Sequence, residues 1–107
     1  MVEAPLSVLL FEDDEGQAIL TKEALEKTGL RVDVSANGRE GLSRLLTTAY
    51  DVHLVDYKLP DIPGIEILRR LMTIKQDAVV IMVTGHGDEA AAEIGRASCR
   101  ERVYVLV

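Results

Sequence analysis

The sequence predicts an α/β fold in which helices cover both faces of a parallel sheet. Short apolar runs alternate with stretches of helical length, which is the pattern of βαβ units. Three of the runs are apolar almost throughout, as buried parallel strands are: 7–11, 52–56 and 78–83. Each of them ends in a carboxylate or is followed at once by a carboxylate or a hydroxyl, at the sheet edge where such folds bind ligands.

Length, charge and cysteine content limit the classes of protein to which the chain can belong. The 107 residues suffice for one domain with one core. Eighteen acids against 12 bases give a formal charge of −6, which argues against direct nucleic-acid binding. No apolar run approaches the ~20 residues that span a membrane, and residues 1–5 lack the features of a signal peptide. Cys99 has no partner for an internal disulfide, so we expect a cytoplasmic protein with no membrane contact.

The first half of the chain should form two strands and two helices. After a lead-in, strand 7–11 precedes a helix over 15–28, with Asp14 as its N-cap and Gly29 just past its end. Strand 30–34 alternates like a half-buried strand near an edge, and Asn37 and Gly38 form a turn. A helix over 40–48 follows. The residues expected to face inward are Ala18, Ile19, Ala24 and Leu25 in the first helix and Leu42, Leu45 and Leu46 in the second.

The second half repeats the pattern. Strand 52–56 leads into a loop over 59–64, and a helix over 65–74 precedes strand 78–83. A turn at 85–87 and a helix beginning after Asp88 should follow. The residues on the apolar side of the third helix are Ile65, Leu68, Leu71 and Met72.

Three acids and a hydroxyl should converge at the carboxyl edge of the sheet: Glu12, Asp13, Asp56 and Thr84. A carboxylate is a known nucleophile in phosphoryl transfer. The carboxylate and the phosphoryl group are both anions, so a cation has to neutralise them when they meet. Mg²⁺ suits this task because it prefers carboxylate and carbonyl oxygens. The simpler interpretations are that Asp61 is a turn residue, that the Lys58 side chain is solvated and that His53 is packed within its strand.

The sequence resembles the receiver domain of a two-component response regulator. The stretches that carry the resemblance are VLLFEDD at 8–14, LVDYKLPDIPG at 54–64 and IMVTG at 81–85. The resemblance implies a flavodoxin-like (CheY-like), doubly wound sheet in the order 2-1-3-4-5. It also implies that a sensor histidine kinase phosphorylates Asp56. Glu12, Asp13, Asp56 and the backbone carbonyl of Lys58 would then bind Mg²⁺, and Thr84 would be the switch hydroxyl.

Such a module is a phosphoacceptor that assists its own phosphorylation rather than an enzyme, and it signals to an output domain or partner, here unknown. An alternative is a receiver-like interaction module that is never phosphorylated. An aspartyl-phosphate hydrolase is disfavoured, because such enzymes have Asp-x-Asp at the nucleophile and Lys58 stands at the third place here.

The chain departs from the receiver pattern near its end. The fifth strand should carry a lysine near position 106 or 107, but Leu106 and Val107 stand there and no lysine follows Lys75. Residues 93–103 equal the in-frame translation of a common short-read sequencing adapter preceded by a single g. We therefore expect an incomplete receiver over 7–92 and a non-native tail over 93–107. The sequence then does not decide whether a fifth strand forms, and the last helix of the receiver fold is missing. One face of the sheet should then stay uncovered.

Overall fold

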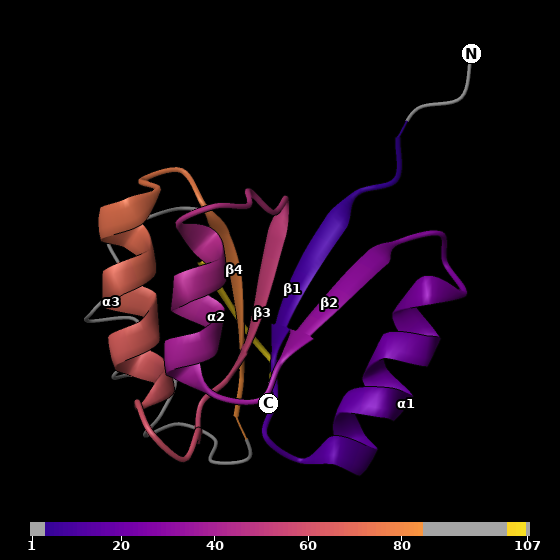
Figure 1. Cartoon of the computed structure of the whole chain (residues 1–107), viewed down its shortest axis with the longest axis horizontal. Coiled ribbons are helices and arrows are strands. Elements are labelled where there is room, and N and C mark those ends of the chain that lie inside the picture. The colour runs from indigo at the N-terminus through magenta and orange to yellow at the C-terminus, as the bar shows by residue number, and fades with distance from the viewer. Residues whose placement is uncertain (1–3, 85–102, 107) are drawn as a thin grey trace.

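The protein, seen here as a computed structural model, is described over residues 4–84 and 103–106. It forms a five-stranded parallel sheet in the order β2-β1-β3-β4-β5 (Figure 1). The strands are β1 (Ser7–Phe11), β2 (Arg31–Ser35), β3 (Val52–Asp56), β4 (Val79–Val83) and β5 (Val103–Leu106). The predicted fold class and strand order are confirmed, and the fifth strand, which the sequence left open, pairs with β4.

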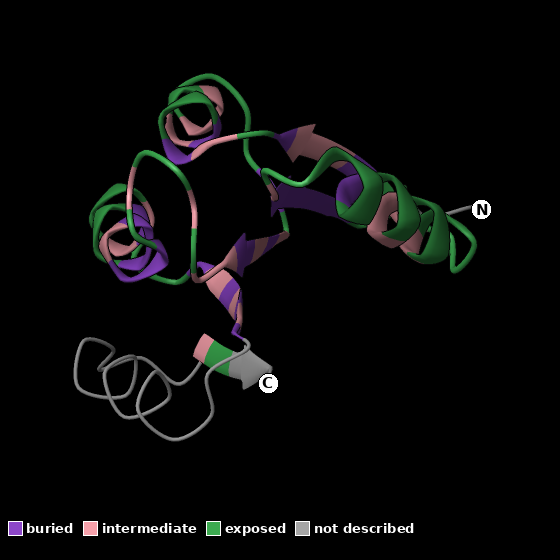
Figure 2. Cartoon of the chain, turned by 90° about the horizontal axis from the view of Figure 1, so that it is seen from below, coloured by how far each residue is buried: buried purple, intermediate pink, exposed green. Residues whose placement is uncertain are grey.

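Three helices cover the sheet unequally. They are α1 (Glu15–Glu26), α2 (Gly38–Leu45) and α3 (Gly64–Ile74). Figure 2 shows α2 and α3 on one face and α1 alone on the other. The larger core lies under α2 and α3, where Phe11, Val55 and Ile67 are fully buried, whereas Val8, Leu10 and Val32 form a smaller core on the side of α1. Ile67 was missing from the predicted apolar side of its helix.

The helix ends follow local side-chain chemistry. Asp14 caps α1 as predicted, since its Oδ1 accepts from the Gln17 amide at 2.9 Å. Gly29, just past the helix, has a φ of 93°, which glycine adopts without strain. The predicted turn at Asn37 is wrong. Asn37 is the N-cap of α2 and accepts from the Glu40 amide at 2.8 Å, so α2 begins at Gly38.

Three residues expected to face inward are exposed: Ile19, Ala24 and Leu46. Leu46 follows the end of α2 and is 75% exposed. Ile19 is 50% exposed, because it lies in a groove beside Val34 of β2, and β2 is the edge strand of the sheet. The helix expected after Asp88 lies outside the described residues. Within the described residues, no helix is long and apolar enough to cross a membrane.

The face of the sheet on the side of α1 is only partly covered where β3 and β4 run. Burial alternates along both strands (Figure 2), and the partly exposed residues on this side, which we call the open face, are Val52, Leu54, Val79, Ile81 and Val83. Among the described residues, no helix stands over this part of the sheet. Within residues 4–84 and 103–106, the apolar surface that the sequence predicts to be uncovered is therefore partly exposed.

Polar contacts fix the strand ends opposite the acidic edge. Asp51 Oδ2 accepts from the amide of Ser7 at 2.7 Å and from its hydroxyl at 3.1 Å. The Asp51 amide in turn donates to the Ser7 carbonyl at 3.0 Å. His53 is buried, and its Nδ1 donates to the carbonyl of Val79 at 3.0 Å, which confirms a packed histidine. These contacts tie together the amino ends of β1, β3 and β4.

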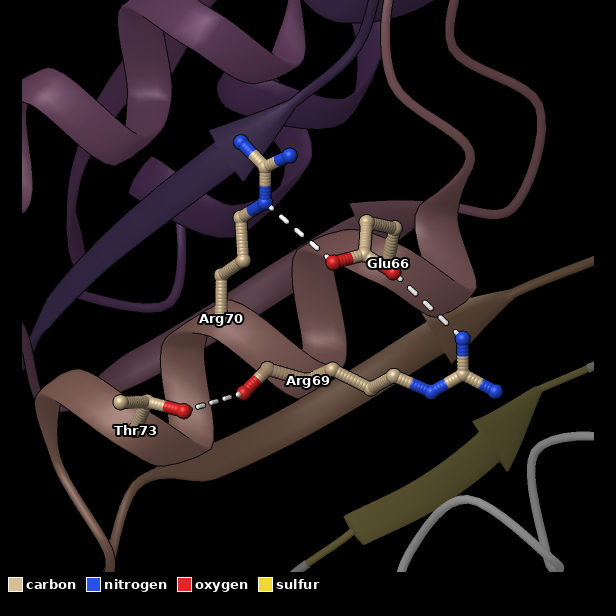
Figure 3. A network of polar contacts seen from close by, with 4 residues as sticks. All are labelled: Glu66, Arg69, Arg70 and Thr73. Carbon is tan, nitrogen blue, oxygen red and sulfur yellow. Dashed lines mark hydrogen bonds and ion pairs between the residues drawn. The ribbon is translucent and has the colours of Figure 1, made fainter.

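The outer side of α3 carries a small ionic network (Figure 3). Glu66 contacts Arg69 at 3.4 Å and Arg70 at 3.3 Å, and the Thr73 hydroxyl donates to the Arg69 carbonyl at 3.1 Å. Exposed pairs of this kind contribute little to stability. We therefore assign the position of α3 to its buried apolar side rather than to this network.

Candidate functional site

The structure brings three of the predicted site residues together. Glu12 and Asp13 directly follow β1, and Asp56 is the last residue of β3. Because Phe11 pairs with Val55, Glu12 stands level with Asp56 in the neighbouring strand. One carboxylate oxygen from each of the three residues lies within 4.8 Å of the others. This spacing and this all-oxygen donor set fit a hard divalent cation such as Mg²⁺.

The charges in this cluster oppose one another. The pKa of Glu12 is raised to about 7, mainly by burial and to a smaller extent by the nearby charges of Asp56 and Asp13, although the Asp14 amide hydrogen bond acts in the opposite direction. That amide donates to Glu12 Oε2 at 3.2 Å. Without a cation, the cluster therefore resists carrying its full negative charge.

The loop after β3 holds Asp56 in place. The Lys58 amide donates to Asp56 Oδ1 at 3.0 Å, and the Tyr57 amide donates to the Val83 carbonyl at 2.8 Å. The Lys58 side chain belongs to an exposed residue, as predicted. The Lys58 carbonyl, the fourth predicted metal ligand, therefore belongs to a segment whose backbone is hydrogen-bonded both to Asp56 and to the end of β4.

Thr84 lies beside the cluster in the sheet. It follows Val83, the residue of β4 that pairs with Asp56, and it is 3% exposed. Its position one residue beyond the partner of Asp56 is where a hydroxyl serving that carboxylate would be expected. A groove of about 240 Å³ reaches the site from the open face, with Glu12, Asp56 and Thr21 among its lining residues.

Sequence reasoning missed the role of one further residue of this edge. Asp61 was predicted to be a turn residue only, yet its carboxylate accepts hydrogen bonds from the amides of Gly38 and Arg39 at 2.8 and 2.9 Å. The partners lie 23 and 22 residues earlier in the chain. Local sequence carries no signal of this contact, because it depends on how α2 and the loop meet in space.

An acidic cluster at the carboxyl edge of a doubly wound sheet in the order 2-1-3-4-5 defines a CheY-like domain of the flavodoxin-like fold. The family model for the response regulator receiver domain matches residues 8–98. The chain belongs to this family, whose members are signalling modules of two-component systems.

One curated relative and one solved protein illustrate the likeness. Sporulation initiation phosphotransferase F of Bacillus subtilis is 35% identical over 81 residues, which are 76% of this chain and 65% of the relative. The chain thus spans less than two thirds of that relative. The response regulator TrrA of Thermotoga maritima, solved in complex with Mg²⁺-BeF, has a TM-score of 0.82 at 26% identity, covering 95% of this chain and 86% of TrrA. TrrA has also been solved with the histidine kinase ThkA, with a TM-score of 0.80 at 25% identity and the same coverage.

Proposed function

We propose that the protein is a phosphoacceptor that takes a phosphoryl group from a sensor histidine kinase onto Asp56. The observation that carries the proposal is the meeting of Glu12, Asp13 and Asp56, with carboxylate oxygens within 4.8 Å of one another. The likeness to TrrA supports the proposal, since that protein has been solved with Mg²⁺-BeF and with a histidine kinase. A cytoplasmic location would suit such a module, which would pass its state to an output domain or partner.

Each residue has a distinct task in this proposal. An Asp56 carboxylate oxygen attacks the phosphorus, the bond from phosphorus to the donor nitrogen breaks, and the electron pair stays on the donor imidazole. Glu12, Asp13, Asp56 and the Lys58 carbonyl would hold Mg²⁺. The bound ion would neutralise charge on the phosphoryl oxygens and on the carboxylates. The Thr84 hydroxyl would donate to a phosphoryl oxygen and so report phosphorylation to the chain that follows it.

The test is phosphorylation by a small-molecule donor. The protein is incubated with acetyl phosphate and Mg²⁺, and intact mass spectrometry should show the gain of one phosphoryl group. The Asp56→Asn variant should gain none, whereas Asp77→Asn, a matched change at an exposed aspartate outside the cluster, should behave like the parent. An equal gain of mass in Asp56→Asn would refute the assignment.

The interaction module that is never phosphorylated remains the second candidate. It is favoured by one sequence feature, the lack of any lysine after Lys75. A degenerate receiver has no need of the metal, so Mg²⁺ binding at millimolar concentration distinguishes the two functions. Titration calorimetry measures this Mg²⁺ binding directly, with the Asp13→Asn variant as the control.

We also propose that residues 93–107 are not native, although β5 falls within them. The proposal is supported by the match between residues 93–103 and an adapter sequence. Sequencing the source genomic DNA from codon 80 onward tests it. A different sequence after Ala92, with a lysine near the expected place, would restore an ordinary receiver, whereas genomic codons for residues 93–107 would refute the proposal and favour the interaction module.

A further inference from the structure

The carboxylate of Asp61 joins the loop between β3 and α3 to the start of α2. Asp61 Oδ1 accepts from the Gly38 amide at 2.8 Å, and Asp61 Oδ2 accepts from the Arg39 amide at 2.9 Å. Its Oδ1 also accepts from the Ile62 amide at 2.8 Å. Both oxygens are therefore engaged, although Asp61 is an exposed residue.

These contacts complete the first turn of α2. The first amides of a helix have no partner within the helix, and negative charge is favourable there. The N-cap Asn37 accepts from the third of these amides, that of Glu40, and Asp61 accepts from the first two. Desolvation raises the pKa of Asp61, but the backbone hydrogen bonds outweigh it and leave the pKa below its ordinary value. The side chain is thus an anion bound to the end of a helix.

The same loop carries the candidate metal site. It begins directly after Asp56, and its second residue, Lys58, donates its amide to Asp56 Oδ1 at 3.0 Å. The loop closes where the Gly64 amide donates to the Tyr57 carbonyl at 2.9 Å. Between these two points, Asp61 accepts two hydrogen bonds from α2, at the end of the molecule where the strands terminate (Figure 1).

We propose that Asp61 is a positioning residue that anchors the loop on α2 and thereby presents the Lys58 carbonyl and the Asp56 carboxylate to the metal ion. This inference rests on the proposed function for its metal, though not for the anchoring itself. Asp61 does not touch the ion. It acts through the backbone between Lys58 and Gly64, as residues that orient metal ligands commonly do.

The test compares two losses of capping at the same helix end. Asp61→Ala removes the anchor together with the cap, whereas Asn37→Ala removes only the hydrogen bond to Glu40 and leaves the loop untouched. We expect Asp61→Ala to weaken Mg²⁺ binding about tenfold by titration calorimetry. The Mg²⁺ affinity of Asn37→Ala should stay within about twofold of that of the parent. Its melting temperature should nevertheless fall by about as much as that of Asp61→Ala, because both variants lose a cap of the same helix.

A second readout needs no metal. Amide hydrogen exchange at Gly64, measured by NMR on the metal-free protein, should accelerate in Asp61→Ala and stay at the parent rate in Asn37→Ala. Asp61→Asn keeps one acceptor oxygen, so it should recover part of the Mg²⁺ affinity and part of the protection of the Gly64 amide. It serves as the test variant if Asp61→Ala fails to fold.

Two results would overturn the inference: equal Mg²⁺ affinities in Asp61→Ala and Asn37→Ala, or an unchanged Gly64 exchange rate in Asp61→Ala. A parent protein that binds no Mg²⁺ would refute the proposed function instead. In that case the exchange rates alone decide whether Asp61 anchors the loop.

Discussion

Gly41 gives the sharpest test of the packing, because sequence and structure predict opposite effects for the same change. In a helix, Gly41→Ala should stabilise by about 1 kcal/mol through its higher helix propensity. In the structure, Gly41 of α2 faces the ring of Phe11, which is 0% exposed. A Cβ added to Gly41 would lie 2.6 Å from both Cδ2 and Cζ of that ring, closer than real Cβ atoms approach.

The magnitude follows from these two opposing effects. Overpacking a core costs about 1–3 kcal/mol, and the upper half of this range applies because the ring is fully buried. After the gain in helix propensity is subtracted, Gly41→Ala should lower the free energy of unfolding by about 1–2 kcal/mol. Urea unfolding followed by circular dichroism measures the difference.

Two further variants make the test specific. Gly16→Ala in α1 is the matched control, since its Cβ would meet only Asp14 Oδ1 at 3.5 Å, an ordinary contact, and it should not destabilise. Phe11→Leu should relieve the clash, so the double variant should be more stable than the sum of the single changes by about 1 kcal/mol. A stabilising Gly41→Ala, or strict additivity with Phe11→Leu, would refute the reasoning.

Three other outcomes are expected. Among the described residues, Ser35 Oγ is buried without a hydrogen-bond partner, so Ser35→Ala should raise the free energy of unfolding in urea by about 1 kcal/mol; a loss of stability would reveal a partner. The folded-state pKa of Glu12, about 7 against an ordinary 4.5, means that the metal-free fold binds the extra proton, so stability should fall as pH rises from about 4.5 through 7. Glu12→Gln should flatten that fall in urea unfolding at pH 5 and pH 8 while weakening Mg²⁺ binding, and an unchanged pH dependence would assign it to other groups. The open face should leave the chain marginally stable or prone to aggregate, and cooperative thermal unfolding near 45–65 °C without aggregation would contradict this expectation.

The fold and most of the acidic cluster could be predicted because both follow from local pattern. Apolar runs define the strands: Glu12 and Asp13 follow the first strand directly, and Asp56 is the last residue of the third. Parallel strands end at one edge, so convergence of these acids needed no knowledge of side-chain packing. Their metal-binding and phosphoacceptor roles remain predictions.

What could not be predicted depends on contacts between distant parts of the chain. The burial of Gly41 against Phe11 and the hydrogen bonds of Asp61 join segments that periodicity does not relate. Ile19 has the right helical phase for burial but lies beside β2, and no further strand of the described part of the chain pairs with the outer side of β2. Phase gives the side of a helix that faces the sheet, and only the assembled sheet determines how much of that side is covered.

The contact between Ser7 and Asp51 has a consequence for the distant acidic edge. It joins the starts of β1 and β3, and the ends of the same two strands carry the three carboxylates. A slip of one strand past the other by one residue would shift its end by about 3.3 Å and turn each side chain to the opposite face. Oxygens held within 4.8 Å of one another would not survive such a shift. Ser7 and Asp51, at the opposite end of these two strands, thus fix the register on which the spacing of the three carboxylates depends.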